Sequence, residues 1–487
     1  MTRPLTATAA LAIVLVAAPS PAQPPPNPDE PKAVRVSGSL RSRVESWSWF
    51  QGNANADYTY VGSLLRLSLV GSKKSYGGHV ELAVPVLLGL PDDALAPGAQ
   101  GQLGFGAAYF AANDRATHVA SLFPKQAFLE LKGLGSGKRQ SLVLGRMEVI
   151  EGAETTPATT TLAALKRDRI AHRLIGNFGF SHVGRSLDGV RYVANGPALN
   201  LTVIGGRPTR GVFQADGWRE LQSNVFYGAL TGRVARTHAA DDWRIFGLVY
   251  SDYRRAVLKT DNRSLAARQN DGDSIHVGTI GGHYLGTVDT GVGAIDVLFW
   301  AAAQTWSWGQ LAHRAVAVAV EAGWQPRAPG ALKPWIRAGD NRGSGDDDAT
   351  DTKHGTFFQV LPTPRVYARF PFFNLMNLDD RFVEAIVRPG RLVVRTDVHW
   401  LRLADAHDLW YSGGGAFQPD TFGYSGRPSN GQTGVGTLYD VSADAAVSTH
   451  LGLGAYFGAV RGGAVVHTIY PRDASAALGY LELTYRF

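Results

Sequence analysis

Apolar and polar residues alternate with a period of two along most of this chain. Near its start, "VRVSGSLRSRVESW" places Val36, Leu40 and Val44 on one face and Arg41 and Arg43 on the other. The same alternation recurs in "LLRLSLV", "HVELAVPV", "RLVVRTDVHWL" and the closing "LGYLELTYRF". Successive side chains of a β-strand point to opposite faces, so the pattern predicts an all-β protein whose strands separate two different environments.

Strands of this kind occur in soluble sandwiches and propellers, where the apolar face meets a protein core, and in membrane barrels, where it meets lipid. No repeat of propeller-blade length is visible, which counts against a propeller. The polar faces carry charge, for example Arg43 and Glu45 in one strand and Arg395 and Asp397 in another. One arginine facing lipid at the bilayer midplane would cost about 2–4 kcal/mol, so these faces must meet water. We therefore expect a transmembrane antiparallel β-barrel with a water-filled lumen.

The number of strands follows from the length of the chain. Membrane strands have about 9–11 residues and, with short turns at one rim and longer loops at the other, each strand uses roughly 25 residues. At that rate the about 465 residues that follow Ala22 hold about 18 strands, an even number as in bacterial single-chain barrels. A barrel of that size leaves an aqueous channel.

Aromatic residues gather near the ends of the predicted strands. They are Trp47, Trp49, Tyr58, Tyr60, Trp306, Trp308, Trp400, Trp410 and Tyr411. Membrane barrels carry aromatic girdles at both membrane interfaces, so we expect these rings to lie there. For any single ring, ordinary core packing is the alternative.

The first 22 residues have the pattern of a secretory signal peptide, with a basic Arg3, a short apolar run and small residues up to Ala22. The apolar run is shorter than the about 20 residues that a membrane-spanning helix needs, which favours cleavage over anchoring. A Pro-rich spacer is expected at residues 23–32, where a helix cannot form, and the barrel at residues 33–487.

The last strand is expected to turn its apolar side chains to lipid and to pair with the strand that begins near Val34. Those side chains are Leu481, Leu483, Tyr485 and Phe487. A terminal aromatic after such alternation resembles the signal that the assembly machinery of outer-membrane barrels recognises. The expected location is therefore the outer membrane of a Gram-negative type of cell, with membrane lipid and the assembly machinery as partners.

Composition limits the chemistry. The chain has no cysteine, which excludes disulfides and thiolate metal sites, and we expect neither a metal nor another cofactor. The formal charge of +7 would permit nucleic-acid binding, but an exported chain without a basic helix or Walker-type loop is not expected to bind nucleic acid.

One interior connection lacks alternation. It spans roughly forty residues between strands that end near Arg146 and begin near Asp188, and connections of that length are usually functional or disordered. Its piece "LAALKRDRIAHRLIG" concentrates positive charge, with Lys166, Arg167, Arg169 and Arg173 against the single acid Asp168. Folded inward, this loop would bring positive charge into the pore, and folded outward it would be a solvated surface loop. The sequence leaves both possibilities open.

Four stretches carry a family resemblance. "LGRMEVIEGAE" with "RLIGNFGFSHVGRSLDGVRY" resembles the Gly-Arg strand, loop and following strand of the alginate export family of outer-membrane barrels. "AGDNRGSGDDDATDTKHGTFFQVLPTPRVYARFPFFNLMNLDD" resembles the acidic loop and the Leu-Pro-Thr element of that family, and "LRLADAHDLWYSGGG" is also similar. The resemblance implies an 18-stranded barrel whose constricted, electropositive lumen passes an anionic polysaccharide such as alginate, with periplasmic export components as further candidate partners.

The sign of the charge fits such a substrate, because a uronate chain repeats one carboxylate per sugar and the planar guanidinium fork matches a carboxylate. The candidate pore-lining residues are Arg41, Arg43, Arg66, Arg146, Arg185, Arg191, Arg395, Glu45, Asp188 and Asp397. For each, the alternative is an ion pair that holds the barrel wall. Alternation sets Asp188 opposite Arg185 and Arg191, so grouping these three requires a strand that begins near Asp188 or a bulge.

Other functions remain as alternatives. A general anion-selective porin for small solutes would share the barrel and the arginines. A barrel hydrolase is the less favoured alternative, because Asp397 and His399 share a face but no nucleophile accompanies them, and we expect no enzyme. The acidic stretch "GDNRGSGDDDATD" lacks the ligand order of an EF-hand and is expected to be a solvated loop.

Overall fold

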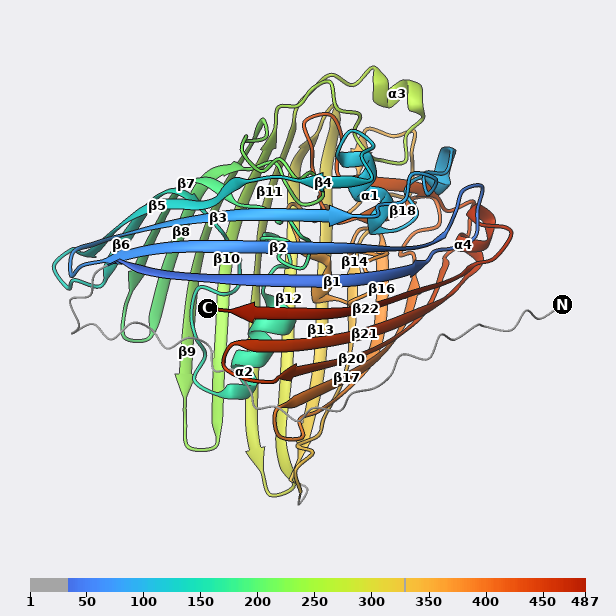
Figure 1. Cartoon of the computed structure of the whole chain (residues 1–487). Coiled ribbons are helices and arrows are strands. Elements are labelled where there is room, and N and C mark those ends of the chain that lie inside the picture. The colour runs from blue at the N-terminus through green and yellow to red at the C-terminus, as the bar shows by residue number, and fades with distance from the viewer. Residues whose placement is uncertain (1–33, 328–329) are drawn as a thin grey trace.

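Eighteen long strands form one closed antiparallel barrel, which confirms the predicted fold (Figure 1). The computed structural model describes residues 34–327 and 330–487, and the predicted signal peptide and spacer lie outside these residues. None of the helices in the described ranges is long and apolar enough to cross a membrane.

The strands follow one another around the barrel in chain order, each paired antiparallel with the next. The first nine are β1 (Arg35–Ser48), β2 (Asp57–Ser72), β3 (Tyr76–Leu88), β5 (Phe123–Leu134), β6 (Gln140–Met147), β7 (Leu187–Asn195), β8 (Leu199–Pro208), β9 (Ser223–Ala235) and β10 (Ala239–Asp252). The other nine are β11 (Ile275–Thr290), β12 (Gly293–Trp308), β13 (Leu311–Pro326), β14 (Trp335–Gly343), β16 (Leu378–Val387), β17 (Leu392–Arg402), β20 (Gly434–Ala446), β21 (Leu451–Gly462) and β22 (Ser475–Arg486). Pairing of β22 with β1 closes the barrel.

Short elements decorate one rim and the lumen. Strands β4 (His118–Ala120) and β15 (Lys353–His354) extend the sheet, while β18 (Leu409–Gly413) and β19 (Tyr424–Pro428) form a separate hairpin. The helical segments are η1 (Gly98–Gln100), α1 (Phe105–Ala112), α2 (Thr160–Leu165), the π-helical η2 (Lys166–Ile170), α3 (Leu265–Gln269), η3 (Pro364–Val366) and α4 (Ala464–Ile469).

The two rims of the barrel differ. One has tight turns such as residues 196–198, and the other has long loops, among them residues 148–186, 344–377 and 403–433. Helices α1, α3 and α4 and strand β18 gather at the long-loop rim, and the C-terminus lies at the other (Figure 1). In barrels of this type the short turns face the periplasm and the long loops face the outside.

The predicted two-faced strands are present. On β13, Val316, Val318 and Val320 are about half exposed on the outer face, whereas Ala317 and Ala319 between them are buried. On β1, Val36 is 71% exposed, in contrast to the buried Arg43 and Glu45 on the opposite face. The alanines on the inner face of β13 are small, which leaves room in the lumen for chain that folds inward.

The C-terminal strand lies as predicted. Leu481, Leu483, Tyr485 and Phe487 are all exposed on the outer face. Phe487 exchanges two backbone hydrogen bonds with Gly38, of 2.8 and 3.0 Å. A β-carbon on Gly38 would lie 2.5 Å from the Phe487 ring, so the glycine makes room for the terminal aromatic.

The prediction that the aromatic rings lie at the membrane interfaces is wrong for most of them. Of the nine rings, only Trp306 and Trp400 are exposed on the outer wall, at 52% and 49%. The buried ones are Trp47, Trp49, Tyr60, Trp308, Trp410 and Tyr411. They either share the inward face of their strand or lie in loops, and at the long-loop rim they pack with other rings, as Trp47 does with Phe105 and Phe370. Core packing, the alternative for a single ring, therefore applies to these side chains.

We expect Phe487→Ala to reduce the amount of protein that inserts into the outer membrane, because the last aromatic both packs on Gly38 and ends the alternating strand. The measurement is the amount of heat-modifiable barrel in isolated membranes. Phe457→Ala is the matched control, since Phe457 has the same 53% exposure on the wall. Equal membrane levels for both variants would contradict the prediction.

Candidate functional site

The loop of residues 148–186 folds into the lumen. Lys166 Nζ lies 3.0 Å from Asp242 of β10, and Arg169 Nε lies 2.9 Å from Glu321 of β13. Helix α2 of this loop lies inside the barrel in Figure 1 and contacts β10 and β11. Of the two possibilities that the sequence left open, the inward one is found.

The same loop reaches the other side of the barrel. Asp168 lies 3.1 Å from Arg395 of β17, and Arg395 also lies 2.9 Å from Glu384. Burial alone would raise the pKa of the Asp168 carboxyl, but Arg395 and Arg167 lower that pKa below its usual value. Arg167, paired with Asp168 at 2.7 Å, keeps 71% of its side chain exposed. The tip of the loop thus presents an accessible guanidinium in the lumen.

Glu321 of β13 is the centre of the buried charge network. Its carboxylate is fully buried and contacts the guanidinium groups of Arg169, Arg173 and Arg337 at 2.9, 3.2 and 2.9 Å. Arg169 and Arg173 come from the inward loop, whereas Arg337 comes from β14. Arg337 also binds Asp296 of β12. One acid on the wall therefore binds the loop and the neighbouring strand together.

Two predicted pore residues on β1 hold different partners. Arg43 is buried between Glu45, at 2.9 Å, and Glu482 of β22, at 2.6 Å, so it fastens the seam where the barrel closes. Arg41 donates hydrogen bonds to the carbonyl groups of Gly179, at 2.6 Å, and Ser181. Both arginines face inward as predicted, but only Arg41, with 18% of its side chain exposed, is open to the lumen.

Arg66 and Arg191 also face inward. Arg66 of β2 lies between Glu81 and Glu148, 2.8 Å from the latter, and keeps 26% of its side chain exposed. Arg191 of β7 is partly exposed, and its Nε has no hydrogen-bond partner among the residues that the structure describes. These two arginines line the wall beside the inward loop.

Arg185 does not face open lumen. Its guanidinium is 1% exposed and donates to four backbone carbonyl groups, those of Gly176, Leu361, Pro362 and Gly415. Burial lowers the pKa of Arg185 to about 10. Arg185 therefore ties three loops together, and we leave it out of the proposed pathway.

Arg146 and Asp188 form a two-pronged ion pair, with both contacts at 2.6 Å. Arg146 shares its strand face with the exposed Leu144, and Asp188 shares its face with the exposed Val190. The guanidinium also donates to the carbonyl of Trp218 at the rim. No bulge brings Asp188 over to the side of Arg191 in the described pairing of β6 and β7, so the pair lies on the outer face near the long-loop rim and we leave it out of the pathway as well.

Asp397 and His399, the pair considered for hydrolysis, are buried on the inner face of β17. His399 Nδ1 lies 2.7 Å from Asp380, and its ring packs against Phe373 and Phe382. These contacts fit a structural ion pair inside the wall.

Sequence reasoning missed several lumenal charges. Glu321 is the one acid in the alternating "RAVAVAVEAGW", and its isolation in an apolar strand was a usable signal. Arg369 in the loop of residues 344–377 lies 2.6 Å from Asp444 of β20, with 24% and 46% of these side chains exposed. No alternation marks Arg369, because it does not belong to a strand.

A family model for alginate export matches residues 33–479. The chain belongs to the alginate export family. A search of curated proteins finds no match.

Among solved structures, the fold is similar to the outer membrane protein OpdK of Pseudomonas aeruginosa, with a TM-score of 0.53, 9% identity, and coverage of 93% of this chain and 99% of that one. It is also similar to OccAB4 of Acinetobacter baumannii, with a TM-score of 0.54, 8% identity, and coverage of 95% and 100%. A third is OccK9 of P. aeruginosa, with a TM-score of 0.55, 13% identity, and coverage of 93% and 98%. Family and fold together support a channel in the outer membrane.

In this alginate export family member, Glu321→Gln should loosen the inward loop, because removing one partner of a buried ion pair costs about 3–5 kcal/mol. Hydrogen exchange of residues 160–175 should become faster than in the unmodified protein. Asp289→Asn is the control, since Asp289 and Arg327 form an exposed pair worth about 0–1 kcal/mol. Unchanged exchange in Glu321→Gln would show that the network does not hold the loop.

Two acids connect the long loops of the barrel and predict a pH dependence. Burial and the neighbouring carboxylate of Asp408 raise the pKa of Asp346 to about 7, and burial raises the pKa of Asp408 to about 6. The Asp408 carboxylate accepts hydrogen bonds from the backbone N–H of Asp346, at 3.0 Å, and from the Thr356 hydroxyl, at 2.6 Å. These contacts join the loop of residues 344–377 to that of residues 403–433.

A raised pKa means that the folded loops retain protons that the unfolded chain loses above about pH 4. The stability of these two loops should therefore fall as the pH rises from about 4 to about 7. Hydrogen exchange, corrected for its intrinsic pH dependence, measures this effect. Asp346→Asn should flatten the dependence, whereas replacing the exposed Asp347 by Asn should not. A flat profile in the unmodified protein would contradict the prediction.

Proposed function

We propose that this barrel passes an anionic polysaccharide such as alginate through its arginine-lined lumen. The observation that carries the proposal is a set of inward arginines that remain partly accessible after the loops have folded in. Their exposed side-chain fractions are 18% for Arg41, 26% for Arg66, 71% for Arg167, 24% for Arg369 and 23% for Arg395. Family membership supports the choice of substrate class.

The pairing of these arginines suits a polymer that must move. Arg66, Arg167, Arg369 and Arg395 each have a protein carboxylate as partner. An entering uronate carboxylate has to compete with that protein carboxylate for the guanidinium, so each site is weak. A series of weak sites allows both entry and exit.

Aromatic side chains from several segments pack together at the long-loop mouth. Phe50, Phe372, Trp410 and Tyr470 pack against one another there and are buried. Passage of a polymer therefore requires the loops to move, and we propose that the described state is the closed one. The barrel assembly machinery and periplasmic export components are further partners that we propose on the C-terminal strand and the family alone.

A porin for small anions is the second candidate. One of the similar solved structures is OpdK of P. aeruginosa with vanillate, which is a small carboxylate. The same arginines would serve such a solute, and a lumen narrowed by inward loops suits it. We propose no catalytic role, because His399 is held by Asp380 and aromatic rings.

Purified protein in planar bilayers should show a preference for anions over cations, and an added oligouronate should reduce the current. Arg395→Glu should weaken or reverse the preference, since the side chain faces the lumen beside Asp168. Arg381→Glu is the control, because Arg381 is 69% exposed on the outward face of β16.

A preference for cations in the unmodified channel would overturn the electropositive pathway. An unchanged reversal potential in Arg395→Glu would remove that residue from it. If short oligouronates reduce the current no better than acetate does, the small-anion porin becomes the better description.

A further inference from the structure

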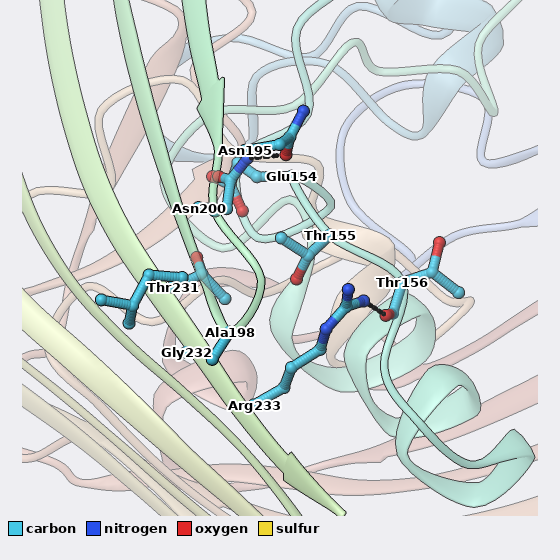
Figure 2. A pocket seen from close by; sticks show the side chains of 11 residues that line it. Glu154, Thr155, Thr156, Asn195, Ala198, Asn200, Thr231, Gly232 and Arg233 are labelled. Atoms are coloured by element: carbon cyan, nitrogen blue, oxygen red, sulfur yellow. Dashed lines mark hydrogen bonds between the residues drawn. The ribbon is translucent and has the colours of Figure 1, made fainter. Parts of the chain in front are cut away.

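A pocket of about 200 Å³ lies at the short-turn end of the lumen, between the inward loop and the wall (Figure 2). Three segments line it: residues 154–156 of the inward loop, the turn from Asn195 to Asn200 between β7 and β8, and residues 231–233 of β9. One water needs only about 10–15 Å³ of such space, so the pocket is large enough for a small organic group.

One end of the pocket accepts hydrogen bonds. Glu154 Oε1 already accepts hydrogen bonds from the Tyr227 hydroxyl, from the backbone N–H of Gly152 at 3.0 Å and from Nη1 of the buried Arg244 at 3.3 Å. Its other oxygen, Oε2, is buried and has no hydrogen-bond partner among the described residues. Asn195 and Asn200, joined by a hydrogen bond of 2.8 Å, lie next to Glu154 in Figure 2.

The middle of the pocket holds an unused hydroxyl. Thr231 is 2% exposed, and its Oγ1 also lacks a partner in the part of the chain that the structure describes. Thr231 shares the inward face of β9 with the buried Tyr227 and Ala229. A buried hydroxyl without a partner is unfavourable, so a group that reached it would add a hydrogen bond without displacing another one.

The opposite end carries positive charge. Arg233 Nη1 donates to the carbonyl of Thr156 at 3.0 Å, drawn as a dashed line beside Arg233 in Figure 2. A guanidinium has five N–H donors, so most of those of Arg233 are available. The pocket thus has an acceptor at one end and a cation at the other, with hydroxyl groups of Thr155 and Thr231 between them.

We propose that this pocket binds one sugar unit of a uronate chain at the short-turn end of the lumen. The sugar hydroxyls bind Glu154 and Thr231, because a hydroxyl both donates and accepts. The sugar carboxylate binds Arg233, whose planar fork matches it. This inference rests on the proposed function and adds one stronger binding site to a path of otherwise weak sites.

Single-channel recording of the full chain in planar bilayers tests the proposal, with a six-residue oligouronate added on the short-turn side. Thr231→Val keeps the shape of the side chain and removes its hydroxyl, and it should shorten each blockade about 2- to 10-fold. Arg233→Gln should shorten the blockades about 10-fold or more, because a hydrogen bond between charged groups is lost.

Two comparisons make the test specific. Thr287→Val is the matched control, because Thr287 is a buried threonine of β11 outside the pocket whose hydroxyl binds the carbonyl of Ile295 at 3.3 Å. Its blockades should keep their length. The second comparison uses a neutral hexasaccharide of glucose, which has hydroxyls and no carboxylate. Thr231→Val should shorten its blockades, whereas Arg233→Gln should leave their length unchanged.

If the unmodified channel prefers anions and is blocked, but Thr231→Val or Arg233→Gln leaves the oligouronate blockades unchanged, the pocket proposal is overturned and the proposed function stands. If the oligouronate does not block the unmodified channel at all, both are overturned. Equal shortening in Thr287→Val would show a general change of the wall and would also overturn the pocket.

Discussion

The buried carboxylate of Glu321 is the interaction on which the arrangement of the lumen depends. An isolated buried charge is strongly unfavourable, and it becomes acceptable only when partners surround it. Two of its three guanidinium partners, Arg169 and Arg173, belong to the inward loop, so the wall is electrostatically complete only when that loop is inside. The same contacts bring Asp168 to Arg395 and leave Arg167 exposed, which determines the charge that a solute would meet.

The fold could be predicted from the sequence because its cause is local. A strand between lipid and water must alternate with a period of two, and each segment, down to the last strand ending at Phe487, shows this without knowledge of its neighbours. The same rule predicts that Arg41, Arg43 and Arg66 lie on the inward face of their strands, where the structure has them. Closure between β1 and β22 also followed, since the only free edges of such a sheet are its first and last strands.

The site could be predicted only in part, because its contacts are not local. Alternation stops where a strand stops, so it gave no face to Arg185, whose carbonyl partners lie up to 230 positions away in the chain. Alternation also could not predict whether the long loop folds inward or outward, because that depends on acids of distant strands. Trp47 shows the same limit, since a ring near a strand end can face lipid or pack inside the long-loop rim, and only its partners Phe105 and Phe370 decide between these two positions.

The two kinds of polar site in the lumen differ in what a sugar would gain. At Arg66 or Arg395 every contact with a substrate carboxylate replaces a contact with a protein carboxylate, so the net gain is small and exchange is fast. In the pocket at the short-turn end, Thr231 Oγ1 and Glu154 Oε2 have no hydrogen-bond partner among the described residues, so contacts with a sugar there would be added rather than exchanged. A chain drawn along weak sites would therefore pause where the barrel leaves hydrogen bonds unmade, and that position lies at the end opposite the long-loop mouth.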